Sequence, residues 1–492
     1  MHKILETACL SVFVSLLLEK RDEHERQLPV RIGKQGFQGR VKGQMHIEFG
    51  AEKMTSYAGL ELFRRLLSKI GVLRELLVSE KRVALAGDLR FRSAVLAVVA
   101  MLLVGARRLR HIEFLRDDPM FLRFAGLKRA PSQRTLSRTL KKLTSRTWPE
   151  LDRSMLSLIG HADEVMKLRR WTLDVDGTVL TTGLRVERAK RGFNPHHRKN
   201  PSYYPILATL AQSGHVVGHM NRRGNIVDAH RSDEFLRDTV CAVREELGFD
   251  GLLELRADSA FFRREFLVAA DLRGLEYAIK VPMWPCFNLR GVVRRKRQTD
   301  WQWIDRDKQV QGLETELHIS TWGRTERIAI YRKRVNHEPS KSRQLDLFNP
   351  DDGKWEYSVV ATNKSLGLRA LWHFYNGRGV QEKTIAELKS GFAFSTIPTN
   401  RYSANTAWQK LSLLSHNIAT TFQLRTSAEA KPRSLKRTTS FLIRSIATLR
   451  FEWLNKAARL LRPGDRPVLR LVDNVPTRDA IRQIEQNLDR AA

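Results

Sequence analysis

The sequence is short of cysteine and of long uninterrupted apolar segments. Its 492 residues include three cysteines that are far apart in the chain, Cys9, Cys241 and Cys286. This odd, scattered set predicts neither a disulfide framework nor a zinc site. The N-terminal apolar stretch over residues 4–18 is interrupted by Glu6 and is too short to span a bilayer. No small-residue cleavage site of a signal peptide follows it, so we expect a cytoplasmic protein.

Acidic residues are also scarce. There are 53 Asp and Glu against 86 Lys and Arg, which gives a formal net charge of +33 and an isoelectric point near 10.6. A chain this basic attracts polyanions over long range, and nucleic acid is the most common of them. The excess runs along the whole sequence and is not confined to a tail. An RNA-binding or ribosomal protein would show aromatic platforms or an RNA module, and the sequence shows neither.

No internal repeat of 20 to 50 residues is visible, and changes in composition and hydrophobic period divide the chain into successive parts. Residues 20–50, which have no apolar period, come after the N-terminal apolar stretch, and they are followed by helical patterns and then by an alternation of strand and helix patterns that is typical of a mixed α/β sheet. The expected parts are an N-terminal arm (1–50), a helical DNA-binding domain (51–165), a first α/β part (166–275), a β-rich insertion (276–365), a second, helical part of the core (366–465) and a basic C-terminal tail (466–492).

A short basic helix is expected at the end of the helical domain. Ser132 is a suitable N-cap, and Leu136, Leu140 and Leu143 form one apolar stripe behind it. The rest of the surface carries Arg134, Arg138, Lys141 and Lys142. Such a helix can lie in a major groove or along phosphates, or it can be a structural helix with a solvated charged face. The sequence alone leaves both interpretations open.

Three acidic residues follow or end predicted strands. Asp174 and Asp176 lie in the strand pattern that begins at Trp171, and side chains two residues apart point to the same face. Asp258 directly follows the predicted strand over residues 252–257. Carboxylates at the ends of sheet strands can converge outside the carboxyl edge and hold a metal ion. A single Asp at the end of a strand is more often a turn residue, so position alone does not assign a function.

A further set of four residues has the spacing of one helix face. Tyr375, Arg378, Glu382 and Lys389 would fall within roughly 60° of one another on one helix. A metal-binding carboxylate flanked by two cations and a phenol suits a phosphate chain that passes a metal ion. The alternative is an exposed face with an ion pair between Arg378 and Glu382.

These residues resemble the Tyr-(2)-Arg-(3)-Glu-(6)-Lys signature of DDE transposases of bacterial insertion sequences. More narrowly, the sequence resembles the group of insertion sequences called IS-thirteen-eighty. This resemblance covers roughly residues 50 to 460. The stretches that carry it are Leu173–Val179 with Gly192-Phe193-Asn194-Pro195, Arg256–Phe262, Tyr375–Gly391 and the later pair His416-Asn417.

The resemblance implies a ribonuclease-H-like catalytic core whose metal-binding, catalytic residues are Asp176, Asp258 and Glu382. Asp176 is preferred because Asp176-Gly177-Thr178 matches the Asp-x-Thr run of the family, with Asp174 as the alternative. The cofactor would be a pair of Mg²⁺ ions, with Mn²⁺ as a substitute. The long stretch between Asp258 and Glu382 would hold the β-rich insertion.

The expected activity is cut-and-paste transposition in the bacterial cytoplasm, at the nucleoid. The partners would be double-stranded DNA, as transposon ends and target, and a second copy of the chain. Tyr375, Arg378 and Lys389 would hold phosphates, together with Arg134, Arg138 and Lys141 of the basic helix. In related enzymes a flipped base meets an aromatic ring of the insertion, for which Trp301, Trp303 and Trp322 are candidates, although core packing is the more common role. A DNA-binding descendant without cleavage and a nuclease without strand transfer are the alternatives.

Overall fold

The computed structural model describes residues 53–490, except 86, 88, 184, 193, 195–196, 198, 335–354, 433–438 and 464–465. The expected arm over residues 1–50 lies outside the described residues, and so do Phe193 and Pro195 of the motif that begins at Gly192. Cys241 and Cys286 are free cysteines. No helix among the described residues is long and apolar enough to cross a membrane.

The first part of the described chain is helical. Helix α5 (Phe91–Val104) is apolar on every side and is buried along nearly its whole length, as such helices are. Around it lie α3 (Leu60–Lys69), α4 (Val72–Val83), α6 (Pro119–Ala125), α7 (Gln133–Lys142) and α8 (Trp148–Met166). These helices are not a separate compact domain, because Lys53–Ala492 clusters as one unit.

Helix α7 is the predicted basic helix, and it begins where its sequence predicts. The Ser132 side chain accepts a hydrogen bond from the Thr135 backbone N–H at 3.1 Å. Leu136 and Leu140 are buried in the core of the helical part, and Leu143 follows them. The basic residues of the helix therefore have only its outer face to occupy.

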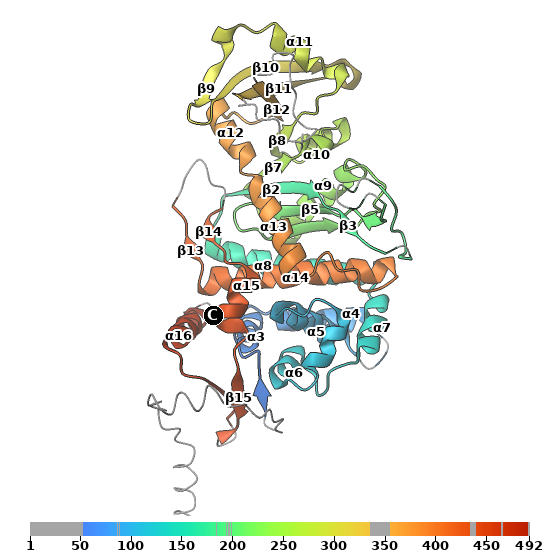
Figure 1. The fold of residues 1–492 in the computed structure, drawn as a ribbon, viewed down its shortest axis with the longest axis vertical. Coiled ribbons are helices and arrows are strands. Elements are labelled where there is room, and N and C mark those ends of the chain that lie inside the picture. The colour runs from blue at the N-terminus through green and yellow to red at the C-terminus, as the bar shows by residue number, and fades with distance from the viewer. Residues whose placement is uncertain are drawn as a thin grey trace, which may run out of the picture. The chain divides into compact units, whose positions relative to one another are not determined.

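A mixed sheet of nine strands forms the rest of the fold, in the order β6-β5-β2-β7-β8-β12-β11-β10-β9 (Figure 1). Strands β2 and β7, and β7 and β8, are parallel, while all other neighbours are antiparallel. The strands β2 (Arg170–Gly177), β5 (Ile206–Leu210), β7 (Leu252–Ala257) and β8 (Glu276–Lys280) lie inside the sheet, and β6 (Val216–Met220) is at one edge.

The strands expected in a β-rich insertion extend this same sheet. Strand β12 (Trp355–Thr362) pairs with β8 through Thr362 and Ala278, and β11 (Arg324–Arg334), β10 (Val310–Ile319) and β9 (Gln302–Asp305) follow outward. The hydrogen bonds of these strands are continuous with those of the core. Figure 1 shows these strands with the short helix α11 (Leu289–Arg294) at one end of the molecule.

Helices cover both faces of the sheet. The face with Leu207 and Val216 packs on α14 (Tyr402–Thr426) and α13 (Gly379–Gly391), and α12 (Leu368–Asn376) covers Ala278 and Val360. The opposite face, with Leu173 and Val175, packs on α9 (Ser232–Cys241) and α10 (Arg264–Leu272). Helix α14 also packs on α5, α7 and α8, so it joins the sheet to the helical part (Figure 1).

The expected basic tail contains more structure than its composition predicts. Strand β16 (Val468–Leu471) pairs with β15 (Ala458–Leu461), which in turn pairs with β1 (Met54–Thr55). Helix α16 (Val475–Arg490) is an element that the expected basic tail did not include. It buries Ile484 and Leu488 against α3 and α14. The signal for this helix was available, because Ile481, Ile484 and Leu488 have the three- and four-residue spacing of one helix face.

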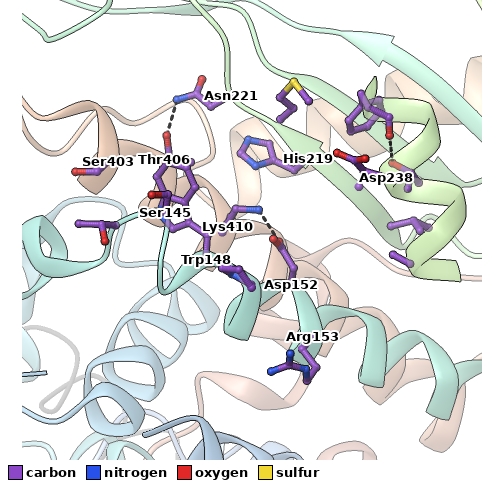
Figure 2. Close-up of a pocket in the computed structure, with 18 of the residues that line it drawn as sticks. Ser145, Trp148, Asp152, Arg153, His219, Asn221, Asp238, Ser403, Thr406 and Lys410 are labelled. Atoms are coloured by element: carbon purple, nitrogen blue, oxygen red, sulfur yellow. Dashed lines mark hydrogen bonds and ion pairs between the residues drawn. The ribbon is translucent and has the colours of Figure 1, made fainter. Parts of the chain in front are cut away.

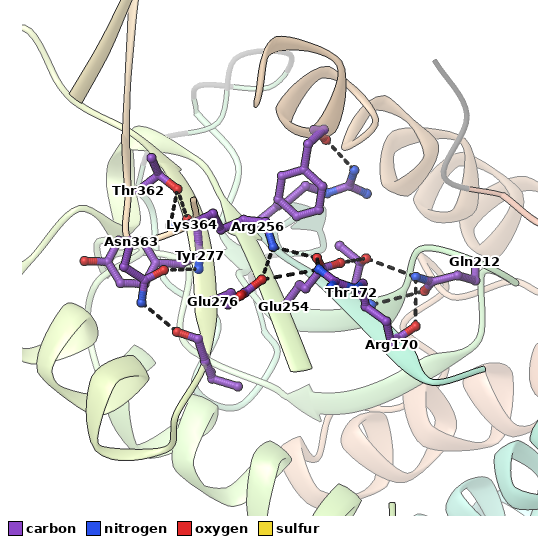
Figure 3. Close-up of polar contacts among 12 residues, drawn as sticks. Arg170, Thr172, Gln212, Glu254, Arg256, Glu276, Tyr277, Thr362, Asn363 and Lys364 are labelled. Carbon is purple, nitrogen blue, oxygen red and sulfur yellow. Dashed lines mark hydrogen bonds and ion pairs between the residues drawn. The ribbon is translucent and has the colours of Figure 1, made fainter. Parts of the chain in front are cut away.

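A buried ionic network holds β2, β7 and β8 together near their N-terminal ends (Figure 3). The Lys364 ammonium, after β12, donates to Glu254 Oε1 at 2.6 Å and to Glu276, while Thr172 Oγ1 donates to Glu254 Oε2 at 2.6 Å. Burial alone would raise the pKa of Glu254, but the hydrogen bonds from Lys364, Thr172 and Arg170 hold that pKa below its usual value. Glu254 therefore contributes stability in its ionised form.

Removing the lysine should destabilise the fold. In Lys364→Met, Glu254 stays buried with less compensation, so the free energy of unfolding should fall by about 3–5 kcal/mol. Because the pKa of folded Glu254 is depressed, the difference from wild type should be complete above pH ~5 and should shrink as the pH falls below ~4. Urea unfolding at several pH values measures it. Lys308→Met, at an exposed turn, should change stability by less than about 0.5 kcal/mol, and an equal loss in both variants would contradict the assignment.

Candidate active site

Asp176 and Asp258 lie side by side at the carboxyl ends of two parallel strands. In the β2–β7 register Asp174 is opposite Arg256 and Val175 is opposite Ala257, so the next residue of each strand is an aspartate. The carboxyl edge of parallel strands is the usual place for ligand-binding groups in such sheets. The register thus places Asp176 and Asp258 next to each other, although they are far apart in the sequence.

The Asp176 carboxylate is mostly buried, with 23% of its side chain exposed, and it is ion-paired. Arg378 Nη2 lies 2.8 Å from Asp176 Oδ2, and the Gly177 backbone N–H donates to Oδ1 at 2.9 Å. Burial raises the pKa of Asp176 to about 6, the Arg378 charge opposes this rise, and Asp258 and Asp228 add to it. The negative charge at this position is therefore costly unless a cation is close.

Asp258 is a turn residue that also lies beside Asp176. Its carboxylate accepts from the Ser259 backbone N–H at 2.5 Å and caps the short turn Ser259–Phe261, as a turn residue would. Its charge also acts on Asp176, Tyr375 and Arg378. The turn hydrogen bond fixes one carboxylate oxygen and so orients the other.

Asp174, the alternative to Asp176, is in a structural ion pair. Its side chain is fully buried, and it accepts from Arg256 Nε at 2.6 Å and from Nη2 at 2.7 Å. Arg256 Nη1 also donates to the Phe374 carbonyl at 2.6 Å, which joins both strands to α12. Burial raises the pKa of Asp174 and the Arg256 charge opposes the rise. This arrangement leaves Asp176 as the aspartate of β2 that faces the open edge.

The four residues of the helical signature do not lie on one continuous helix. Helix α12 ends at Asn376 and α13 begins at Gly379, with Gly377 and Arg378 in the turn between them. The expectation of a single helix face is therefore wrong. Both turn residues keep right-handed backbone angles, which is why the spacing still resembles a helix.

Three of these four residues nevertheless face the acidic edge. The Tyr375 phenol is buried, which raises its pKa, and it feels the charges of Arg378, Asp258 and Asp176. Arg378 is mostly buried, and its Nε has no hydrogen-bond partner among the described residues. Lys389 donates to the Val179 carbonyl at 3.2 Å, and burial lowers the pKa of Lys389 while the Asp176 charge opposes that change. Together they place cations and a phenol beside Asp176.

Glu382 lies on the first turn of α13 and is exposed. The residue before it, Gln381, is buried and donates to the Asp174 carbonyl at 2.8 Å, which holds this turn against β2. Arg378 pairs with Asp176, and no ion pair between Arg378 and Glu382 forms among the described residues. The alternative interpretation, an exposed helix face with an ion pair between Arg378 and Glu382, therefore does not describe this turn.

No three His, Cys, Asp or Glu side chains within the described part of the chain are gathered closely enough to hold a metal ion. The residues at the edge still suit a hard cation. Carboxylate oxygens are the ligands that Mg²⁺ and Mn²⁺ prefer, and Asp228 Oδ1 is buried there, with Arg222 Nη2 3.9 Å away as its ion-pair partner. A Cβ at Gly177 would lie 2.4 Å from that oxygen, so a side chain larger than glycine would close the space.

Asp228 is an acidic neighbour that the sequence interpretation missed. It lies in the loop between β6 and α9, and burial raises its pKa, with the nearby Asp258 charge adding to the rise. Arg222, almost fully buried, orders this loop by donating to the Asp228 and His230 carbonyls, each at 2.8 Å. A carboxylate within a basic, Gly-containing loop is the signal that was available, since a DNA-binding face should carry few acidic residues unless they hold metal.

The remaining predicted residues lie on other elements. Arg134, Arg138 and Lys141 are exposed on α7, and none of them forms an ion pair within the described residues. Trp301 is buried with the Arg332 guanidinium 4.0 Å from its ring, and Trp322 packs against Phe262 at 5.3 Å. Trp303, with 41% of its surface exposed, is the most accessible of the three tryptophan candidates.

The ion pair of Asp174 predicts a clear difference between the two aspartates of β2. Asp174→Ala should lower the free energy of unfolding by about 3–5 kcal/mol, because Arg256 would remain buried and unpaired. The double variant Asp174→Leu with Arg256→Met, which replaces both charges by apolar groups, should recover most of this loss. Asp250→Ala is an exposed control. Chemical denaturation measures all three, and a loss below about 1 kcal/mol for Asp174→Ala would contradict a structural role.

Comparison with known proteins identifies the family. No protein of curated function matches the sequence. Among solved structures, the chain is similar to the piggyBac transposase in a synaptic complex with hairpin DNA, with 11% sequence identity, a TM-score of 0.41 and coverage of 88% of this chain and 85% of that one. A family model described as Transposase DDE domain group 1 matches residues 37–492. This match spans nearly the whole sequence, and the chain therefore belongs to the DDE transposases of that group.

Proposed function

We propose that the protein cuts DNA at the terminal inverted repeats of an insertion sequence and joins the freed 3′-OH ends to target DNA. The observation that carries this proposal is the convergence of Asp176 and Asp258 at the ends of parallel strands, beside Arg378 and Tyr375. Glu382, on the turn that Gln381 holds against β2, completes the proposed catalytic set. The narrower resemblance to the IS-thirteen-eighty group is part of the same proposal.

Asp176, Asp258 and Glu382 would hold the metal ions. When bound, a pair of Mg²⁺ or Mn²⁺ ions supplies an activated nucleophile and stabilises the leaving oxygen of the phosphodiester. The turn hydrogen bond of Asp258 and the fixed turn of Gln381 keep two of these carboxylates in place. Since a cation offsets the cost of charge on Asp176, its raised pKa fits a metal-binding role.

The phosphate chain would be held by Tyr375, Arg378 and Lys389. The Arg378 guanidinium bridges to Asp176 through Nη2 and keeps a free, buried Nε donor that can bind a phosphate oxygen. Lys389 adds a second cation next to Val179. Contacts of this kind position the backbone for cleavage and carry no sequence information.

The arrangement of strands supports a ribonuclease-H-like core. Three antiparallel strands, β6, β5 and β2, continue into the parallel strands β7 and β8, with helices on both faces. In this proposal the strands β9–β12 are the insertion and the helical part before β2 binds DNA. Two copies of the chain would act together, since two transposon ends have to be cut. A DNA-binding descendant without cleavage is the alternative.

Cleavage should depend on metal and on the three acidic residues. We expect Asp176→Asn, Asp258→Asn and Glu382→Gln each to lower the rate of cleavage by ~10³-fold or more, with DNA binding largely kept. The measurement uses labelled duplexes that cover the DNA flanking the gene, with Mg²⁺, with Mn²⁺ and after chelation. Asp228→Asn belongs to the same series and should raise the Mg²⁺ concentration that gives half the maximal rate.

Glu265→Gln, at an exposed glutamate of α10, is the matched control and should cut like wild type. If wild type and variants all bind and none cuts with either metal, the DNA-binding alternative is supported. Equal cutting by wild type and Glu382→Gln would remove Glu382 from the site. Hydrolysis without joining to a target duplex would favour the nuclease interpretation.

The basic face of α7 should contribute to DNA affinity through phosphates. Replacing Arg134 and Arg138 by Gln should weaken binding to all duplexes. The slope of log affinity against log salt should become less steep by about 0.9 for each phosphate that is no longer neutralised. Adding Lys141→Gln should reduce the slope by a third step of this size. The charge-matched control replaces Arg306 and Lys308 by Gln, two exposed cations of the β9–β10 turn. Fluorescence anisotropy at several salt concentrations measures the slope. An unchanged slope would show that α7 is only a structural helix.

A further inference from the structure

Three of the four aspartates near the candidate active site have a guanidinium group of the chain as partner. The pairs are Asp174 with Arg256 at 2.6 Å, Asp176 with Arg378 at 2.8 Å and Asp228 with Arg222 at 3.9 Å. The fourth, Asp258, forms no ion pair within the described residues and accepts from the Ser259 backbone N–H. Two divalent cations would therefore add an excess of positive charge unless one guanidinium group leaves or further negative charge arrives.

Two of these guanidinium groups are fixed by several hydrogen bonds each. Arg256 is fully buried, and it donates to both carboxylate oxygens of Asp174 and to the Phe374 carbonyl. Arg222 is 5% exposed, and it donates to three backbone carbonyl groups around its loop. The release of either group would leave several buried acceptors without a donor, which is costly. Both arginines therefore belong to the fold.

Arg378 is held by fewer contacts. Within the described residues, its guanidinium forms one ion pair, from Nη2 to Asp176 Oδ2, and no hydrogen bond to a backbone carbonyl. Burial would lower the pKa of Arg378, but the nearby negative charges, that of Asp176 first, raise it above its usual value. Arg378 lies in the turn between Gly377 and Gly379, and a Cβ at Gly379 would meet no atom within 4 Å. The guanidinium can thus change partners without breaking backbone hydrogen bonds of the core.

Arg378 and a divalent cation would compete for the same oxygen of Asp176. If Asp176 exchanged Arg378 for a cation and nothing else changed, the guanidinium would remain buried and unpaired. If Arg378 exchanged Asp176 for a DNA phosphate and nothing else changed, the carboxylate would remain buried and unpaired. When both exchanges occur together, each charge regains a partner. Arginine suits the second exchange, because a guanidinium group can form two parallel hydrogen bonds with phosphate oxygens.

From this arrangement we propose that Arg378 is a latch on Asp176 that makes metal binding and DNA binding depend on each other. The latch closes Asp176 to divalent cations until a DNA phosphate takes the guanidinium. This inference rests on the proposed function, since it takes Asp176 as a metal ligand and DNA as the source of the phosphate. A protein this basic binds DNA at many places. The latch confines metal binding to the complexes in which a phosphate reaches Arg378.

The first test measures Mn²⁺ binding from the electron paramagnetic resonance signal of the free ion. It is carried out in mildly alkaline buffer and in the cold, before cleavage proceeds, with and without a duplex that covers the DNA flanking the gene. Binding of Mn²⁺ to the duplex alone is subtracted. Wild type should bind Mn²⁺ about 10- to 100-fold more tightly with the duplex than without it. Without the duplex, Arg378→Gln should bind Mn²⁺ at least about 10-fold more tightly than wild type, and the duplex should then add little.

Two controls separate the latch from a general loss of positive charge. Lys383→Gln removes an exposed cation from the same helix, one residue after Glu382. Lys410→Gln removes the buried partner of Asp152, whose Oδ1 lies 2.5 Å from Lys410 Nζ at the wall of a cavity of about 670 Å³ (Figure 2). Neither control should change the affinity for Mn²⁺ by more than about twofold, because charges at a distance are screened by salt.

The second test measures DNA affinity by fluorescence anisotropy in the presence of a chelator. Asp176→Asn releases Arg378 and should bind the duplex more tightly than Asp258→Asn, although each variant removes one negative charge from the same edge. The slope of log affinity against log salt should be steeper by about 0.9 in Asp176→Asn, for one further phosphate contact. Adding Arg378→Gln to Asp176→Asn should remove this difference.

The outcomes separate this inference from the proposed function. If Arg378→Gln binds Mn²⁺ no more tightly than wild type, while Asp176→Asn abolishes binding in both, the latch is overturned and the metal site stays. Equal DNA affinity and equal salt slope for Asp176→Asn and Asp258→Asn would also overturn the latch. Circular dichroism and melting temperature check that each variant is folded.

The wild-type protein keeps the inference testable even if Arg378→Gln does not fold. If the duplex leaves the affinity of wild type for Mn²⁺ unchanged, the latch is overturned. If wild type binds neither Mn²⁺ nor the duplex, the proposed function fails and the latch fails with it.

Discussion

The geometry of the candidate active site depends on the buried ion pair between Asp174 and Arg256. The two residues are direct neighbours in the parallel register of β2 and β7, and both are shielded from solvent. Asp176 and Asp258 follow them by two residues on each strand, so the pair fixes which side chains meet at the edge. If the register between β2 and β7 shifted by one residue, the charges of Asp174 and Arg256 would be separated inside the protein. Asp176 and Asp258 would then point to opposite faces of the sheet. The hydrogen bond from Arg256 to the Phe374 carbonyl also holds α12 in place, and α12 leads into the turn that carries Arg378.

The sequence was sufficient for features that depend on local chemistry. The strand patterns place Asp176 and Asp258 at or next to strand ends, and the Ser132 cap with its leucine stripe locates α7. The signature residues Tyr375, Arg378 and Lys389 could be connected to the acidic edge because the resemblance supplied a common site, and the structure places all three beside Asp176. The family match supports a transposase in general, while the roles of single residues stay proposals.

Features that depend on distant partners could not be predicted. Asp174 and Asp176 are equivalent by spacing, and only the arrival of Arg256 from another strand distinguishes them. The break at Gly377 preserves helical angles and leaves no sign in the spacing. Asp228 reaches the site because the buried Arg222 folds its loop. Helix α16 carries Ile481, Ile484 and Leu488 at helical spacing, but the surfaces of α3 and α14 on which it packs come from distant parts of the chain.

The continuous sheet has a consequence for how this protein could have changed over time. Strand β8 is bonded on one side to β7 and on the other to β12, which is part of the proposed insertion. If the insertion were lost, β8 would present a row of unpaired backbone groups, the kind of edge that promotes aggregation. In that proposal, β12 is an obligatory neighbour of β8, which is itself paired with the strand that leads to Asp258. The loops and the tip of the segment could then vary, but the segment could not be lost as a module.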